Sequence, residues 1–152
     1  MPTFEGLFRK SNAKPVVYEG KTIHLFDCLK VADGQIITLT FESVNADWRQ
    51  GVELLTDGSF EVLGHSGSDS VVLWQDTAPQ KVALRVHTKK GECSVMNVWD
   101  TGNGLMQQGH NGAAMLIEAT PTGKRYRCND GVADDDFDDL VFRIDMSLVP
   151  TG

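Results

Sequence analysis

Hydrophobic and polar residues alternate along most of the chain in short runs separated by turns. Runs of about four to eight residues with this alternation, rich in β-branched and aromatic side chains, are typical of strands with one buried face. Glycine, asparagine and aspartate interrupt the runs about every ten residues, as expected in a β-sandwich or barrel. The predicted strands are Gln35–Ser43, Val52–Leu55, Phe60–Leu63, Ser70–Gln75, Lys81–His87, Ser94–Trp99, Ala114–Ala119, Lys124–Cys128 and Leu140–Asp145.

Two local patterns add detail to this all-β prediction. The sequence "TDGS" lies between two apolar runs, and an Asp-Gly pair in that position predicts a β-hairpin. Helical periodicity is nearly absent, and its best candidate is Thr22–Val31, for which one or two turns are expected. We therefore predict a single domain over residues 1–152 with about ten strands, folded as a two-sheet β-sandwich, most simply a jelly roll.

The amino-acid composition and net charge of the chain argue against some classes of binding partner. The chain has 152 residues, 41% of them hydrophobic, and a formal net charge of -7, which argues against nucleic acid and anionic membranes because both require clustered Lys and Arg. No apolar window is long enough for membrane insertion. The start, "MPTFEGLFRK", has no signal-peptide pattern. Synthesis in the cytoplasm is expected, with any release or surface association by a route that leaves no N-terminal signature.

Three cysteines, Cys28, Cys93 and Cys128, occur without a C-x-x-C spacing. Their odd number and their strand-like surroundings predict buried free thiols, with a Cys93–Cys128 disulfide as the alternative. The four histidines show no paired spacing, so no zinc site is predicted.

Most of the negative charge lies in one segment, "NDGVADDDFDD" at positions 129–139, called the acidic run below. It contains no Lys or Arg and six aspartates, which are Asp130, Asp134, Asp135, Asp136, Asp138 and Asp139. Such runs are usually solvated loops. Here the run encloses an aromatic residue, Phe137, and directly precedes a predicted core strand, so a freely solvated loop is a poor explanation.

A cation site is the favoured interpretation of the acidic run. Neighbouring carboxylates repel by roughly 1 to 4 kcal/mol per pair, and a divalent ion reverses that repulsion. Oxygen ligands favour Ca²⁺ or Mg²⁺ over zinc, and the irregular set favours Ca²⁺, as one or two ions. The EF-hand pattern fails, because Asp139 stands where that loop needs glycine and a strand follows.

Two further expectations follow from spacing. If the run is extended, alternate side chains share a face, which groups Asp134, Asp136 and Asp138 and turns Asp135 away. A catalytic carboxylate pair, as in glycosidases, needs two carboxyls held about 5 to 10 Å apart across a cleft, and one dense run does not supply that.

The segment "NDGVADDDFDDLVFRI" resembles the calcium-binding segment of the bacterial two-calcium lectins that bind fucose and mannose. Four positions of the family motif, Asp, Asp, aromatic and Asp, are matched by Asp134, Asp136, Phe137 and Asp139. Asp138 stands where the family has Asn. Asp130 aligns with the family's leading glutamate, or Asn129 does if one residue is gapped. A similar motif precedes strands in other extracellular β-sandwich modules of adhesins and surface proteins.

The resemblance implies a mechanism and further ligands. "FESVNADWRQGVELL" resembles the family's early strand, loop and strand, in which an Asn side chain binds calcium, so Asn45 becomes a candidate ligand. In those lectins a C-terminal glycine carboxylate of the neighbouring subunit also joins the site, and this chain ends in Gly152. The implied function is binding of vicinal sugar hydroxyls by calcium, with a homo-oligomer as a further possibility.

The candidate residues for contact with a sugar lie in predicted loops. Trp48 lies in a predicted loop beside Asp47, whereas Trp74 and Trp99 lie in strand patterns and are predicted core residues. The long polar segment "DTGNGLMQQGHNG" offers further polar contacts, namely Asn103, His110 and Asn111.

Three functional hypotheses remain. The first is a calcium-dependent carbohydrate-binding protein, and the alternative is a structural or adhesive β-sandwich module in which calcium only rigidifies a loop. An enzyme, a glycosidase or an esterase, ranks third. No nucleophile elbow, P-loop or dinucleotide fingerprint is present, so we expect a protein that is not an enzyme.

Overall fold

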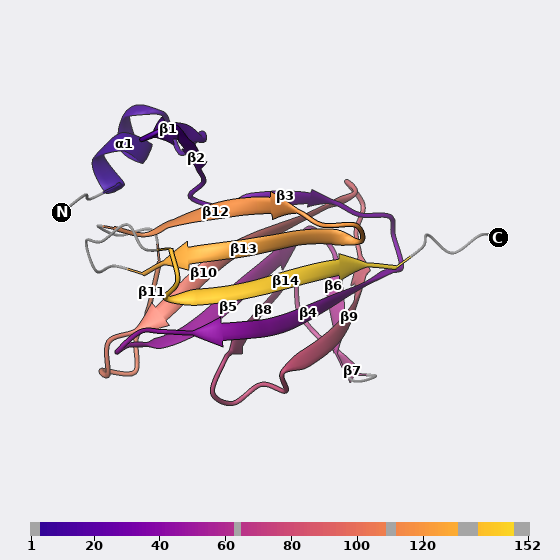
Figure 1. Ribbon diagram of the computed structural model, residues 1–152. Coiled ribbons are helices and arrows are strands. Elements are labelled where there is room, and N and C mark those ends of the chain that lie inside the picture. The colour runs from indigo at the N-terminus through magenta and orange to yellow at the C-terminus, as the bar shows by residue number, and fades with distance from the viewer. Residues whose placement is uncertain (1–3, 63–64, 109–111, 131–136, 148–152) are drawn as a thin grey trace.

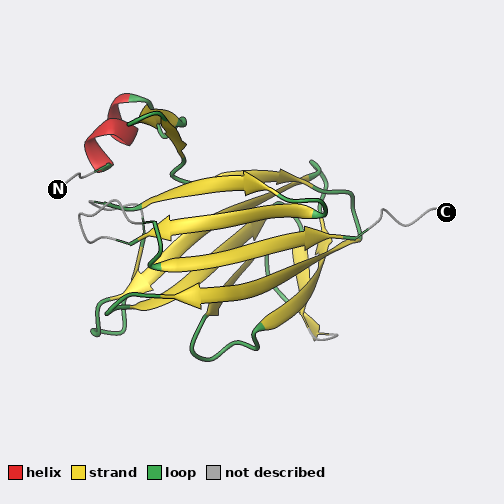
Figure 2. Cartoon of the chain, viewed as in Figure 1, coloured by secondary structure: helices red, strands yellow, loops and turns green. Residues whose placement is uncertain are grey.

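Two antiparallel sheets packed face to face form the body of the protein, which confirms the predicted all-β sandwich (Figures 1 and 2). The computed structural model describes residues 4–62, 65–108, 112–130 and 137–147. These residues contain fourteen strands, of which β1, β2, β7 and β11 have only two or three residues, and a single short helix. No helix in the described ranges combines the length and apolarity needed to cross a membrane.

The first sheet has seven strands in the order β12-β13-β14-β4-β9-β6-β7. Its strands are β4 (Gln35–Val44), β6 (Ser59–Val62), β7 (His65–Ser66), β9 (Lys81–His87), β12 (Ala114–Ala119), β13 (Gly123–Asn129) and β14 (Leu140–Met146).

The second sheet has five strands in the order β11-β10-β5-β8, with β3 also paired to β10. Its strands are β3 (Asp27–Lys30), β5 (Arg49–Thr56), β8 (Ser70–Trp74), β10 (Glu92–Asp100) and β11 (Met106–Gln107). From β4 to β10 the chain crosses repeatedly between the sheets. Each strand turns its apolar face toward the opposite sheet, which accounts for the alternation of apolar and polar residues.

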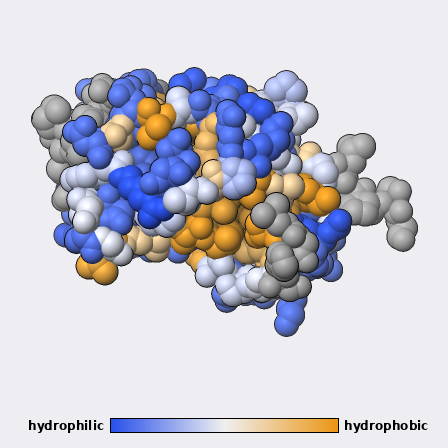
Figure 3. All heavy atoms as spheres, turned by 90° about the horizontal axis from the view of Figure 1, so that it is seen from below, coloured by the Kyte–Doolittle hydropathy of each residue, from blue (hydrophilic) through white to orange (hydrophobic). Residues whose placement is uncertain are grey.

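The main core lies between the sheets. Its largest side chains include Tyr126 and Phe142, whose rings stack at 4.7 Å between centroids. Trp99 is 2% exposed, which confirms its predicted core position, whereas Trp74 is half-buried and lies under the guanidinium of Arg49. Seen from below, hydrophobic residues gather in the middle of one side of the molecule with polar residues around them (Figure 3).

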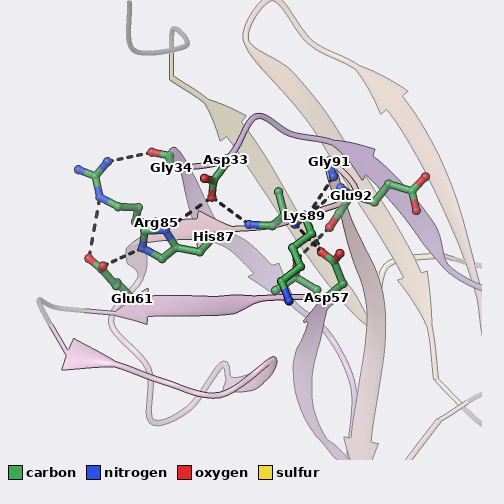
Figure 4. A network of polar contacts seen from close by, with 11 residues as sticks. Asp33, Gly34, Asp57, Glu61, Arg85, His87, Lys89, Gly91 and Glu92 are labelled. Atoms are coloured by element: carbon green, nitrogen blue, oxygen red, sulfur yellow. Dashed lines mark hydrogen bonds and ion pairs between the residues drawn. The ribbon is translucent and has the colours of Figure 1, made fainter. Parts of the chain in front are cut away.

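The predicted hairpin over Asp57 and Gly58 is wrong, because β5 and β6 belong to different sheets. The turn instead carries the chain across the sandwich beside the end of β9. A Cβ on Gly58 would lie 2.0 Å from the His87 carbonyl oxygen, so only glycine fits this approach. The Asp57 carboxylate accepts hydrogen bonds from the Thr88 hydroxyl at 2.6 Å and the Lys89 N–H at 3.0 Å (Figure 4).

The predicted helix at Thr22–Val31 is also wrong. Its residues contribute to β2 (Lys21–Ile23) and β3, and between these strands the N–H of His24 bonds to the Met115 carbonyl oxygen. Strand pairing to β10 and burial of Leu29 against the core outweigh the weak local helical pattern. The helix is α1 (Glu5–Lys10), which precedes a hairpin of β1 (Val16–Tyr18) and β2.

Helix α1 and the β1–β2 hairpin, residues 4–25, are called the N-terminal unit below. They build a second hydrophobic cluster beside β12, above the sandwich in Figure 1. Its buried members are Phe4, Phe8, Ile23, Ala114 and Phe137. The last of these comes from the acidic run, so the N-terminal unit packs directly on that run.

The cysteine prediction holds in part. All three thiols are free, and Cys93 and Cys128 are buried, but Cys28 is exposed because its position in β3 faces outward from the five-stranded sheet.

Candidate cation site in the acidic run

The acidic run connects β13 to β14 at the end of the sandwich where β4 and β10 also finish, on the left of Figure 1. The turn from β4 to β5, residues 45–48, lies at this same end, because antiparallel β4 and β14 are paired along their length. Two loops that are distant in sequence therefore meet around the described aspartates.

Asp130 and Asp139 form the base of the site. Their exposures are 1% and 6%, and the Asp130 N–H donates to the Asp139 carboxylate at 2.9 Å. The Asp139 carboxylate thus lies against the backbone of Asp130, and both acidic side chains are shielded from bulk solvent.

Gln50, in β5, reaches the base from the opposite sheet. Its side-chain Nε2 donates to the Asp130 carboxylate at 2.8 Å and to the Trp48 carbonyl oxygen at 3.2 Å. The residue is 1% exposed, and its Oε1 has no hydrogen-bond partner. A buried acceptor without a donor is uncommon in folded proteins.

A second buried chain of hydrogen bonds shapes the run. The Asn97 side chain, from β10, donates to the Asn129 carbonyl oxygen at 2.8 Å, and the Asn129 side chain accepts from the Phe137 N–H at 2.7 Å. Phe137 has a φ of 54°, a left-handed conformation that is unfavourable for an aromatic residue. Its ring, 3% exposed, stacks on Phe4 at 5.8 Å, so burial in the second cluster compensates for this conformation.

The grouping of Asp134, Asp136 and Asp138 on one face assumes an extended backbone. Phe137 is not extended, with a φ of 54°. Asp134 and Asp136 lie outside the described residues, so their grouping with Asp138 stays a prediction.

The predicted ligand Asn45 does lie beside the acidic run. Its side-chain Nδ2 donates to the Asp138 carboxylate at 3.0 Å, and its backbone N–H donates to the Asp139 carbonyl oxygen at 3.0 Å. Asn45 is exposed and Asp138 is half-buried. The pair is therefore the solvent-facing part of the described site.

The other predicted site residues are distributed unevenly. Asp47 is exposed and Trp48 half-buried on the β4–β5 turn, and Trp48 is tied to the base through Gln50. Asn103 is exposed after β10, and its side chain accepts a local hydrogen bond from the Leu105 N–H at 3.0 Å. Four predicted residues lie outside the described part of the chain, namely Asp134, Asp136, His110 and Asn111.

Sequence reasoning missed Gln50 and Asn97. Asn97 had a usable signal, since it is a polar residue at an inward-facing position of an apolar strand. Gln50 had none, because its role depends on which strand of the other sheet lies opposite.

The chemistry of the described site is that of oxygen ligands. Within the described ranges, no group of three or more His, Cys, Asp and Glu residues is close enough to hold a metal. The oxygen atoms that the described residues could offer to a metal belong to the carboxylates of Asp130, Asp138 and Asp139 and to the side-chain amides of Asn45 and Gln50. Burial, and secondarily the nearby Asp139 carboxylate, raise the pKa of the Cys128 thiol well above its usual value, so this thiol stays protonated beneath the site.

No family model, curated protein or solved structure matches the chain in sequence or fold comparisons.

Proposed function

We propose that the protein binds carbohydrate in a calcium-dependent, lectin-like manner, with Ca²⁺ held by the acidic run. The observation that carries this proposal is the pair of buried carboxylates, Asp130 and Asp139, at the base of an aspartate-rich connection. Carboxylate oxygens gathered in one connection between strands are the ligands that a hard divalent cation such as Ca²⁺ prefers.

The ligand set combines the sequence motif with the neighbouring turn. The proposed ligands are Asp130, Asp134, Asp136, Asp138, Asp139 and Asn45. Their oxygens suit Ca²⁺, which takes six to eight oxygen ligands in flexible geometry. The ion would neutralise the carboxylates and offer open positions to vicinal sugar hydroxyls.

The sugar side of the site is proposed from loop residues, of which Asp47 and Trp48 lie in the turn between β4 and β5. Trp48 supplies an apolar ring, and sugar rings commonly pack on such rings because their C–H faces are apolar. Polar contacts are assigned to Asp47, Asn103, His110 and Asn111.

A glycan array tests the proposal directly. We expect sugar signals in millimolar Ca²⁺ that disappear in EDTA and return when Ca²⁺ is restored. Sugar binding that is unaffected by EDTA would contradict the calcium mechanism.

A structural role is the second candidate, favoured by one observation. Asp130 and Asp139 are shielded from solvent, so an ion bound between them would stabilise the connection without touching a sugar. Calcium binding measured by calorimetry together with a blank array would favour this structural or adhesive module.

A further inference from the structure

The unpartnered Oε1 of Gln50 indicates what belongs at the base of the acidic run. Leaving a buried acceptor without a partner costs about 1 to 3 kcal/mol. Reversing the amide does not remove the problem, because Nε2 already donates to two acceptors, the Asp130 carboxylate and the Trp48 carbonyl oxygen. The orientation of the amide is therefore fixed, and Oε1 remains an acceptor.

Oxygen acceptors accumulate around this point. Gln50, Asp130 and Asp139 are 1%, 1% and 6% exposed. The Gln50 Nε2 donates to the Asp130 carboxylate at 2.8 Å, and the Asp130 backbone N–H donates to the Asp139 carboxylate at 2.9 Å, so the three residues are buried neighbours. Ca²⁺ binds oxygens at about 2.4 Å, so one ion joins oxygens up to about 4.8 Å apart. A cation bound here would give the buried amide oxygen of Gln50 the partner that it lacks.

We infer that Gln50 is a further cation ligand, whose Oε1 joins the carboxylates of Asp130 and Asp139 in an inner Ca²⁺ site. This inference rests on the proposed function and divides its site in two. The inner ion is enclosed between the sheets and stabilises the connection, whereas the solvent-facing pair Asn45 and Asp138 belongs to the part that meets sugar.

Two substitutions separate the oxygen of Gln50 from its N–H groups. Gln50→Met fills similar space without any oxygen ligand, and we expect Ca²⁺ affinity to fall about 10- to 100-fold, the usual cost of losing a residue that supports a metal site. Gln50→Glu keeps oxygen ligands but loses the donors, and we expect it to bind Ca²⁺ at least as tightly as the wild type. In EDTA the Glu variant should melt below the wild type, because three carboxylates then meet in one buried place.

Calorimetric titration with Ca²⁺ and thermal melting in EDTA and in Ca²⁺ measure these effects. Gln75→Glu is the matched control, because it adds the same charge on a half-buried residue whose N–H bonds to the Gln50 carbonyl oxygen. We expect this control to keep the wild-type affinity.

The outcomes are distinct. If Gln50→Met binds Ca²⁺ like the wild type, or if Gln50→Glu loses as much affinity as Gln50→Met, the amide oxygen is not a ligand and the inference is overturned while the proposed function stands. If the wild type takes up no Ca²⁺, the proposed function and the inference fail together.

Discussion

At the scale of single residues, burial distinguishes the aspartates of the acidic run. Asp130 and Asp139 are enclosed, and Asp138 is half-buried beside the exposed Asn45. Neutralising an enclosed carboxylate of the proposed site removes a ligand charge, so the affinity for Ca²⁺ should fall.

We therefore predict that Asp139→Asn weakens Ca²⁺ binding roughly 10- to 100-fold. The substitution keeps the shape and an oxygen acceptor for the Asp130 N–H. Asp135→Asn is the control, since its position matches no ligand of the lectin motif, and it should change affinity far less. Equal losses in both variants, measured by calorimetry, would indicate diffuse attraction of cations rather than a defined site.

At the scale of elements, the strands could be predicted but their partners could not. Lys81–His87 and Ala114–Ala119 have the bounds that their alternation predicts, because one face of each packs on the core. The Asp57-Gly58 turn gives the local signal of a hairpin, yet nothing local specifies whether the next strand pairs with the last one or crosses to the other sheet. The crossing turn is held by hydrogen bonds from the residues that follow β9, about thirty positions later in the chain.

The same reasoning explains what could be predicted of the site. The aspartates were found because they are consecutive in sequence, and Asn45 because a family motif suggested it. Gln50 contacts Asp130 across 80 positions of the chain, and only the packing of the two sheets brings them together.

The sheet-crossing turn gives a pH-dependent prediction. The hydrogen bond from the Thr88 hydroxyl, and then those from the Lys89 and Lys90 N–H groups, hold the pKa of Asp57 below its usual value. A lowered folded-state pKa contributes stability above the unfolded pKa of about 3.9, and this is lost as the pH falls through the folded value. Asp57→Asn should therefore melt below the wild type at pH 7, and the difference should shrink below about pH 4.

Thermal melts from pH 3 to pH 7 check this expectation. Asp76→Asn removes the partner of Arg49 in an exposed ion pair, and it should have little effect, because such pairs contribute little. If the melting temperature of Asp57→Asn lay below that of the wild type by the same amount at every pH, the charge of Asp57 would not be the cause of its stabilising effect.

At the scale of the whole molecule, the sandwich core and the second cluster of the N-terminal unit meet at the acidic run. We predict that Ca²⁺ stabilises this assembly as a unit. A ligand that binds only the folded state adds about 2.7 kcal/mol at a hundredfold excess over its dissociation constant. For a chain of this size that corresponds to a rise in melting temperature of roughly 5 to 10 °C. A melting curve indifferent to millimolar Ca²⁺ and to EDTA would remove the cation site from consideration.

Phe137 of the acidic run stacks on Phe4 of the N-terminal unit. The position of that unit is therefore coupled to the conformation of the proposed cation site. Thermodynamic linkage is reciprocal. If docking of the N-terminal unit raises the affinity for the ion by some factor, the bound ion raises the docking equilibrium of that unit by the same factor. If the site binds calcium as proposed, displacing Phe4 would weaken that binding without altering any ligand. Conversely, binding of the ion should slow the amide hydrogen exchange of α1, although α1 supplies no ligand.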